Sequence, residues 1–172
     1  MFSTQLSGLF KKIQEQNEFE LEDGARLLAQ AVVGDGCIYV RGFGEMEAVE
    51  AEAVFGAEPL AYVKKWESDL DCRDVTGADR VLMFTRFSND ADAIELGREL
   101  HERGLAFVAV CTVVDTENNL GDLADVVIDL KLAKGLLPGE EGNRIGYPGA
   151  MAGLFVYYAL KFTLDEIMED VE

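Results

Sequence analysis

The first part of the chain repeats apolar residues with the period of an amphipathic helix. One run, with apolar positions at i, i+3, i+4 and i+7, predicts a helix that starts near Ser3, and a second run predicts a helix that ends near Val33. The two runs consist of Leu6, Leu9, Phe10 and Ile13, and then of Leu21, Ala25, Leu28 and Ala29. Gly34, Asp35 and Gly36 interrupt the pattern, so residues 1–34 are predicted to form an N-terminal helical pair.

Beyond this pair, short apolar runs alternate with longer helical segments. The runs predicted as strands are residues 37–40, 59–63, 80–85, 106–111 and 126–130, and the predicted helices are residues 45–55 and 90–103. Continuous apolar strands that alternate with helices indicate a parallel sheet covered on both faces. We therefore expect residues 1–172 to fold as a single α/β domain, because a chain of this length can bury a sizeable core.

The last part of the chain combines a glycine-rich segment with an apolar helix. Residues 131–147 contain four glycines and are predicted to form a long excursion, which is a type of loop that often has a function. Pro148 is expected to open the final helix at the first helical position, where proline fits best. The spacing of Met151, Leu154, Phe155 and Tyr158 predicts the face of this helix that is buried in the core and in a subunit interface.

The net charge of the chain argues against some classes of binding partner. The chain has 33 acidic and 15 basic residues, a formal net charge of −18, which argues against nucleic acids and anionic membranes as partners. An apolar fraction of 49% excludes a disordered acidic tail. The longest nearly apolar run, residues 150–160, is well short of the ~20 residues that a membrane-spanning helix needs.

The cysteines and the N-terminus indicate the compartment. Cys37, Cys72 and Cys111 are odd in number and widely spaced, so neither a disulfide framework nor a zinc site is expected. Residues 1–16 have no continuous apolar core and no small-residue cleavage site of the kind found in signal peptides. We expect a cytoplasmic protein without a metal or cofactor.

Three stretches have the spacing of a known family. They are ADRVLMFT at residues 78–85, ERGLAFVAV at residues 102–110 and LADVVIDL at residues 123–130. With the two preceding helices and the Gly-x-Gly turn, this order resembles the sugar isomerase (SIS) domain family, over roughly residues 29–160. The resemblance implies a five-stranded parallel sheet in the flavodoxin-like order with helices on both faces. It also implies a homodimer or homotetramer that binds sugar phosphates at the carboxyl ends of the strands, as free-standing phosphoheptose isomerases of this size do.

The resemblance also places two phosphate-binding turns, each with substitutions. The family pattern S-x-S-G-x-[ST]-x-E aligns with residues 85–92, where Thr85 keeps a hydroxyl but Asp90 replaces the serine or threonine that would bind phosphate. In the first turn, Glu45 stands where a serine is expected. A carboxylate near a phosphate is repelled by on the order of 1 kcal/mol in water and by more where it is partly buried.

The candidate ligand-binding residues lie in these two turns and at the strand ends beside them. They are Arg41, Gly42, Gly44, Glu45, Thr85, Arg86, Ser88, Asn89 and Asp90. Arginine suits a bidentate grip on phosphate, and Arg144 in the excursion offers another guanidinium.

Each candidate also has a structural interpretation. Arg41 with Glu45, and Arg86 with Asp90, could form internal ion pairs, and Ser88, Asn89 or Asp90 could cap a helix. The glycines could serve only a tight strand-to-helix turn.

No catalytic residue can be assigned from the sequence. An aldose–ketose isomerase needs a base, but the single histidine, His101, falls in the last turn of its helix, away from the carboxyl edge of the sheet. Glu50 and Glu52 fall near the position of an acid in isomerases of the family, but solvated-face acids explain them as well. The sequence leaves open a sugar-phosphate-binding protein, an active isomerase, and a non-catalytic relative that acts in regulation or oligomeric assembly.

Overall fold

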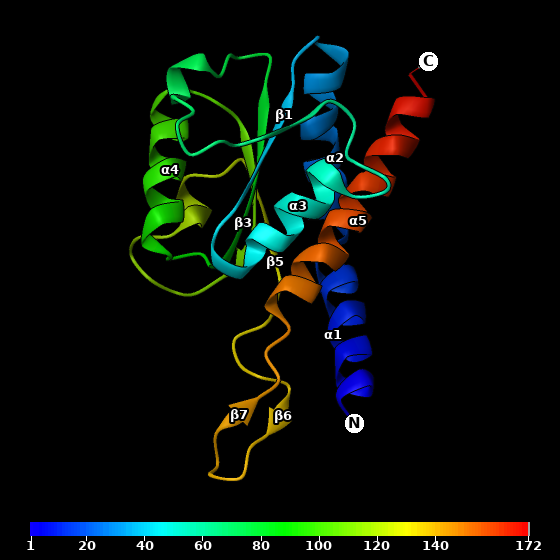
Figure 1. Ribbon diagram of the computed structural model, residues 1–172, viewed down its shortest axis with the longest axis vertical. Helices are drawn as coiled ribbons and strands as arrows, with labels where there is room; N and C mark the ends of the chain where they lie inside the picture. Colours follow the sequence, from blue (N-terminus) through cyan, green and yellow to red (C-terminus); the bar gives the residue numbers. More distant parts are fainter. Residues whose placement is uncertain (172) are drawn as a thin grey trace.

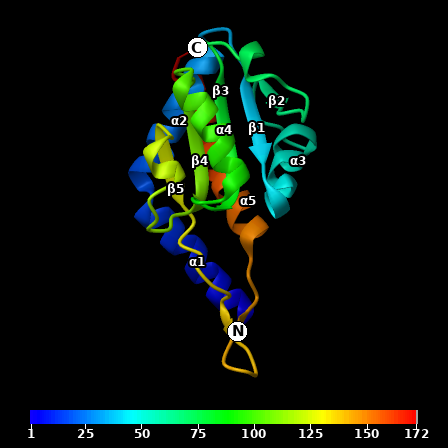
Figure 2. The same cartoon turned by 90° about the vertical axis from the view of Figure 1, so that its left-hand side faces the viewer.

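Five parallel strands form the central sheet of the protein, whose computed structural model describes residues 1–171. The strands are β1 (Ile38–Gly42), β2 (Val63–Lys65), β3 (Arg80–Phe87), β4 (Phe107–Thr112) and β5 (Val126–Asp129). Their order in the sheet is β2-β1-β3-β4-β5, which is the flavodoxin-like order (Figure 2). The predicted α/β class and the five-stranded parallel sheet are confirmed.

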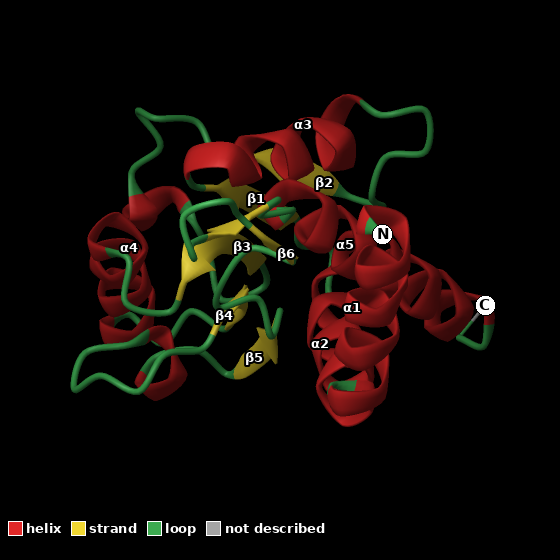
Figure 3. Ribbon diagram, turned by 90° about the horizontal axis from the view of Figure 1, so that it is seen from below, coloured by secondary structure: helices red, strands yellow, loops and turns green. Residues whose placement is uncertain are grey.

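Helices cover both faces of this sheet (Figure 3). The helices are α1 (Phe2–Gln16), α2 (Glu18–Val33), α3 (Glu47–Phe55), α4 (Ala91–Glu102) and α5 (Gly149–Glu169). Alternate residues of β3 explain the two layers: Leu82 and Phe84 pack with α1, α2, α3 and α5, whereas Val81 and Met83 pack with α4. This alternation decides which turn each side chain at the end of β3 can reach.

The second strand lies later in the chain than the sequence predicts. The expected strand at residues 59–63 is wrong, because Leu60 is buried beneath α3 and its amide donates to the carbonyl of Ala53. The observed β2 has the sequence Val-Lys-Lys and lies at the edge of the sheet. Edge strands are commonly short and lysine-rich, since those features discourage pairing with other chains, and such a strand has no apolar pattern to detect.

The buried face of α5 also differs from the prediction. Met151 is 44% exposed, while the buried positions include Ala152, Gly153, Val156 and Leu160. A Cβ atom on Gly153 would lie only 2.8 Å from the sulfur of Met46, so glycine lets α5 approach that residue closely. Because the helix is apolar around most of its circumference, spacing alone did not identify the face that packs. Pro148 occupies the N-cap position, one residue before the position predicted.

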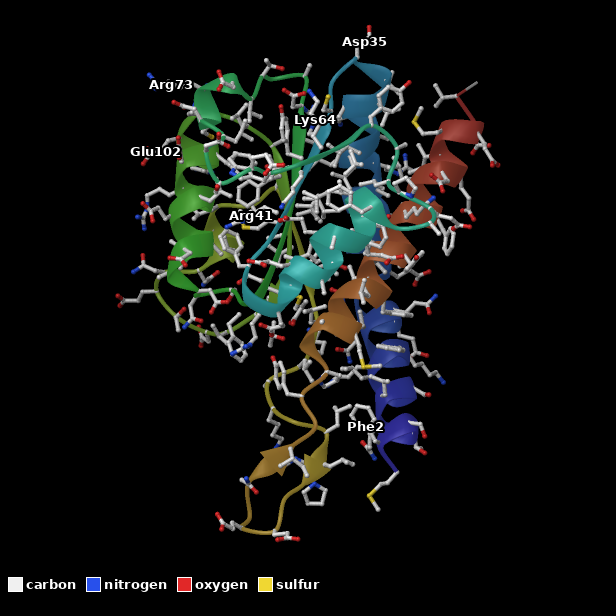
Figure 4. All side chains as sticks on the ribbon, in the orientation of Figure 1. Phe2, Asp35, Arg41, Lys64, Arg73 and Glu102 are labelled. Carbon is white, nitrogen blue, oxygen red and sulfur yellow. The ribbon has the colours of Figure 1, made fainter. Side chains whose placement is uncertain are left out.

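The glycine-rich excursion after β5 forms a hairpin below the sheet. Its two short antiparallel strands are β6 (Leu137–Pro138) and β7 (Arg144–Ile145). The hairpin extends from the domain beside the start of α1, as Figures 1 and 2 show. In Figure 4, Phe2 lies near the hairpin, and a Cβ atom on Gly146 would be 3.3 Å from the Phe2 ring.

None of the helices in the described part of the chain is long and apolar enough to span a membrane.

A buried asparagine joins the first two helices to the sheet. Asn17, between α1 and α2, is 2% exposed. Its side-chain amide donates to the carbonyl of Asp129 at 2.9 Å, and its side-chain oxygen accepts from the Asp129 amide at 2.9 Å. One side chain therefore fixes the end of β5, from which the excursion departs.

We expect Asn17→Ala to lower the free energy of unfolding by about 2 kcal/mol, because it leaves the main-chain groups of Asp129 without partners in a partly buried site. Urea unfolding followed by circular dichroism would measure this loss. Gln16→Ala, at the exposed neighbouring position, serves as the control. Equal stability of the two variants would show that the Asn17 bonds contribute nothing.

Candidate functional site

Two turns meet at the carboxyl edge of the sheet because β1 and β3 are parallel neighbours. The first is the 3-10 turn η1 (Gly44–Met46) after β1, and the second connects β3 to α4. Gly42 lies opposite Phe84 in the register, and the amide of Phe43 donates to the Phe84 carbonyl at 2.9 Å. The turns are thus held side by side, as the crevice rule for open α/β sheets leads one to expect.

The glycines of the first turn are required by its geometry. A Cβ atom on Gly42 would lie 2.1 Å from the main-chain oxygen of Met46, a distance that no side chain can tolerate. Gly44 has φ +59°, in the left-handed region that favours glycine. The Gly-x-Gly sequence therefore makes a tight turn that brings Glu45 to the carboxyl edge of the sheet.

Glu45 and Arg86 form an ion pair that bridges the two turns. Arg86 donates from Nε to Oε1 of Glu45 at 2.8 Å and from Nη2 to Oε2 at 2.9 Å, a bidentate arrangement. The side chains are 30% and 51% exposed, respectively. The hydrogen bonds from Arg86 hold the pKa of Glu45 below its ordinary value, although burial opposes this shift.

The two ion pairs predicted from the sequence, Arg41 with Glu45 and Arg86 with Asp90, are therefore wrong. Arg86 pairs with Glu45 and not with Asp90, whereas Arg41 lies 3.9 Å from Glu50. Arg86 follows Leu82 and Phe84 on the face of β3 that carries η1, which explains its partner. The period of two along the strand was the signal that could have predicted this pairing.

Asp90 uses the polar groups of the second turn. Its Oδ2 atom accepts from the hydroxyl of Thr85 and, at 3.2 Å, from the amide of Phe87. Asp90 occupies the N-cap position of α4 but makes no side-chain hydrogen bond to the helix. The carboxylate thus takes up a hydroxyl and an amide of the kind that a phosphate would need.

Ser88 and Asn89 are directed to other parts of the molecule. Ser88 is fully buried, and its hydroxyl accepts from the amide of Val114 at 3.0 Å. Asn89 lies in a shallow surface hollow beside α4, together with Ile94. Neither residue lines the two hollows beside Arg86 that are described below.

Arg41 and Glu50 form a separate cluster. Glu50 is buried and accepts from the amide of Gly42 at 2.8 Å. Lys65 lies 3.7 Å from the same carboxylate, and the Arg41 guanidinium stacks over the Phe43 ring at 4.7 Å. These contacts hold the start of the first turn. They also occupy the Glu50 carboxylate, so Glu50 is not available to a ligand that binds beside Arg86.

The excursion supplies residues that the sequence did not point to individually. A hollow of about 530 Å³ is lined by Glu45, Arg86, Phe87, Ala133 and Tyr147. The Tyr147 hydroxyl donates to the Leu132 carbonyl at 2.7 Å, and its ring lies 5.9 Å from the Arg86 guanidinium. Burial raises the pKa of Tyr147, so the phenol stays protonated at neutral pH. The glycine content of the excursion was the only signal for these residues.

A second hollow of about 340 Å³ lies on the other side of the ion pair. Its lining includes Gly44, Asp90 and Asp92 as well as Glu45 and Arg86. The Glu45–Arg86 pair is therefore a wall common to both hollows, and we call the two hollows together the crevice.

The single histidine does not lie at this site. His101 is exposed in the last turn of α4, at the opposite edge of the sheet, and its Nδ1 atom lies 3.1 Å from the Leu123 carbonyl. Within residues 1–171, no three His, Cys, Asp or Glu side chains are grouped to hold a metal.

Comparison with known proteins places the chain in a family. The family model described as Domain of unknown function (DUF2529) matches residues 1–168. The chain belongs to this family. It is also 42% identical over 170 residues to the uncharacterized protein YwjG of Bacillus subtilis (strain 168), covering 99% of this chain and 97% of the relative.

Solved structures of low sequence identity share the fold. Phosphoheptose isomerase GmhA from Neisseria gonorrhoeae aligns with a TM-score of 0.66 at 16% identity, covering 96% of this chain and 95% of its own. The Vibrio vulnificus NanR protein complexed with ManNAc-6P aligns with a TM-score of 0.71 at 14% identity, covering 98% of this chain and 62% of its own. A putative phosphosugar isomerase involved in capsule formation from Bacteroides fragilis gives a TM-score of 0.67 at 14% identity, covering 87% and 80%. The DUF2529 chain therefore has the SIS-like fold of phosphosugar isomerases.

The Arg86–Glu45 pair makes a prediction about pH. Because the pKa of Glu45 is lowered from 4.5, the pair stabilises the fold above that pH, and the effect disappears as the pH falls through the lowered pKa. The pair contributes at most about 1 kcal/mol to the free energy of unfolding, since both side chains are partly exposed. Arg86→Ala should return the pKa of Glu45 toward 4.5, measured by carboxyl ¹³C NMR.

Arg98→Ala, which removes an exposed arginine of α4, should leave the Glu45 titration as it is in the unmodified protein. A Glu45 titration that Arg86→Ala does not change would contradict the ion pair.

Proposed function

We propose that this protein binds a carbohydrate derivative of the sugar-phosphate class in the crevice between its two turns, and does not isomerise it. The observation that carries the proposal is the Glu45–Arg86 pair at the carboxyl edge of the sheet, between two hollows. Ligands of open α/β sheets bind at this edge. One fold neighbour is named as a complex with ManNAc-6P and others as phosphosugar isomerases, which supports this ligand class.

Arg86 is the group that would hold the anion. The exposed pair with Glu45 is worth at most about 1 kcal/mol, so a ligand phosphate can displace the carboxylate at little cost. The guanidinium would then make its two parallel hydrogen bonds to phosphate oxygens. The released Glu45 carboxylate could accept hydrogen bonds from sugar hydroxyls in the adjoining hollow.

Asp90 limits how tightly this ligand is held. Its carboxylate already accepts from the Thr85 hydroxyl and the Phe87 amide, which a phosphate would otherwise use. The charge of Asp90 also repels a dianion at the same turn. We therefore expect weak binding, centred on Arg86 and not on the second turn.

The proposal of binding without turnover rests on how the candidate bases of the described residues are engaged. In the unliganded protein, the hydrogen bonds from Arg86 lower the pKa of Glu45, and a carboxylate with a lowered pKa is a weaker base. Glu50 is committed to the Gly42 amide and to two cations, and His101 lies at the other edge of the sheet. The proposed role is that of a sugar-phosphate-responsive protein in regulation or oligomeric assembly.

We further propose that the protein acts in the cytoplasm as a homodimer or homotetramer. Met151 and Phe162 are exposed on α5, and burial of both side chains between copies of the chain would favour association. Light scattering would give a mass that is two or four times 18.9 kDa. A mass of 18.9 kDa would remove this part of the proposal.

We expect Asp90→Ser to tighten binding of sugar phosphates about tenfold or more, because it removes a repelling charge and adds a hydroxyl at the turn. Serine is also accepted at an N-cap, so α4 should remain intact. Thermal unfolding with pentose, hexose and heptose phosphates would measure the effect. A ligand at 100 times its Kd adds about 2.7 kcal/mol, a shift of several degrees.

Asp92→Ser is the matched control, since it removes one acid from the same hollow without touching Thr85 or Phe87. Arg86→Ala should abolish the ligand-induced shift. The binding proposal fails if no sugar phosphate stabilises either the unmodified protein or Asp90→Ser. Turnover of an aldose phosphate would instead identify an isomerase.

A further inference from the structure

A second cavity lies outside the crevice, between α1 and the excursion. It has a volume of about 400 Å³ and falls within the size range of small-molecule sites. Its walls are the face of α1 from Gln5 to Lys12, the segment from Lys131 to Leu136, and Arg144 of β7. Figures 1 and 2 show that α1 and the hairpin extend together below the sheet. We call this cavity the basic pocket.

The charge of the basic pocket is opposite to that of the protein. Its lining contains four cationic side chains and no acidic residue, although acids outnumber bases more than two to one in the chain. The cations are Lys12, Lys131, Lys134 and Arg144. At physiological ionic strength, charges more than ~8 Å away are largely screened, so these near cations and not the net charge decide what the pocket attracts.

Most of this positive charge is not neutralised by the protein. Among the cations of the pocket, Lys131 alone has a carboxylate partner in the described part of the chain, Asp129 at 2.9 Å. Arg144 donates to the main-chain carbonyls of Gly135 and Leu136, which fixes the guanidinium without cancelling its charge. Within residues 1–171, Lys12 and Lys134 make no ion pair and no side-chain hydrogen bond.

The main chain of the same wall adds polar capacity. Among the described residues, no protein acceptor receives a hydrogen bond from the amides of Ala133, Lys134 or Gly135. Lys131 has φ +54°, in the left-handed region that is unfavourable for a non-glycine residue. Glycine would relieve this strain but would lose the ammonium group. Ammonium, guanidinium and amide groups are the donors that phosphate oxygens require, and the residues that line the basic pocket carry all three kinds of group.

Apart from Gln5, the uncharged side chains of the lining are apolar. Leu9 and Leu132 are buried, and Leu136 is partly buried beside them. A ligand would therefore place its anionic group among the lysines and Arg144 and an uncharged part against the leucines. Ala133 lines both this pocket and the crevice, so the two sites adjoin at this residue.

We propose that the basic pocket is a second ligand site, which binds a small phosphorylated molecule through its phosphate group. It is independent of the crevice and of any sugar bound there, since none of its cations lines the crevice. Lys12 and Lys134 supply mobile charge, and Arg144 supplies a fixed guanidinium. Their arrangement favours phosphate over a monovalent carboxylate, because several cations converge on one volume.

Site-resolved NMR tests this proposal with inorganic pyrophosphate as the probe, at constant ionic strength. The amide signals of Gly8, Lys12 and Lys134 should shift saturably, and those of His101 should not. Lys12→Gln with Lys134→Gln should raise the Kd about tenfold, because two charges are removed from contact with the anion. Lys11→Gln is the matched control, since Lys11 neighbours Lys12 but pairs with Glu15 and does not line the pocket.

Two further variants separate the outcomes. Lys12→Arg with Lys134→Arg should keep the affinity within about threefold, which would assign the effect to charge and not to helix packing. In Arg86→Ala the pocket signals should still shift, even if sugar phosphates no longer bind the crevice. The proposal is overturned if the shifts are linear and do not saturate, if Lys11→Gln weakens binding as much as the double variant, or if only crevice signals respond.

Discussion

Parallel pairing of β1 with β3 is the constraint on which the candidate site depends. It brings together two turns that are far apart in the sequence, so that Glu45 and Arg86, 41 residues apart, can form a bidentate pair. The tight turn at Gly42 sets the direction from which Glu45 arrives, because the Met46 carbonyl leaves no room for a side chain. Alternation along β3 then sends Arg86 toward η1 and Thr85 toward α4.

Carboxylates form many of the hydrogen bonds that hold the turns at this edge of the sheet. Asp90 bonds to Thr85 and Phe87, Glu50 bonds to the Gly42 amide, and Glu45 holds Arg86. Each carboxylate accepts hydrogen bonds from donor groups of the protein. In an empty phosphate site, such donors would instead be exposed to water. The turns are therefore stable without a ligand, and the consequence is that a ligand has to compete with internal partners.

The fold by itself does not decide the chemistry. Identities of 14–16% to solved sugar-phosphate proteins accompany a closely similar arrangement of helices and strands. Function depends on particular side chains at the edge of the sheet, and there this chain has acids at two positions where the resemblance leads one to expect hydroxyls. The excursion adds features of its own: Tyr147 at the crevice and a wall of the basic pocket.

The sequence by itself determined the class of fold and most element positions, because helical and strand periods are local and each buried face has to repeat with its own period. It did not locate β2, whose edge position favours lysines, or the buried face of α5, which is apolar on nearly all sides. It named Glu45, Arg86 and Asp90 as neighbours of one crevice, but it also placed Ser88 and Asn89 there and paired Arg86 with the wrong acid. Only the tertiary structure decided those partners, since the choice depends on strand direction and register between distant segments and not on spacing along the chain.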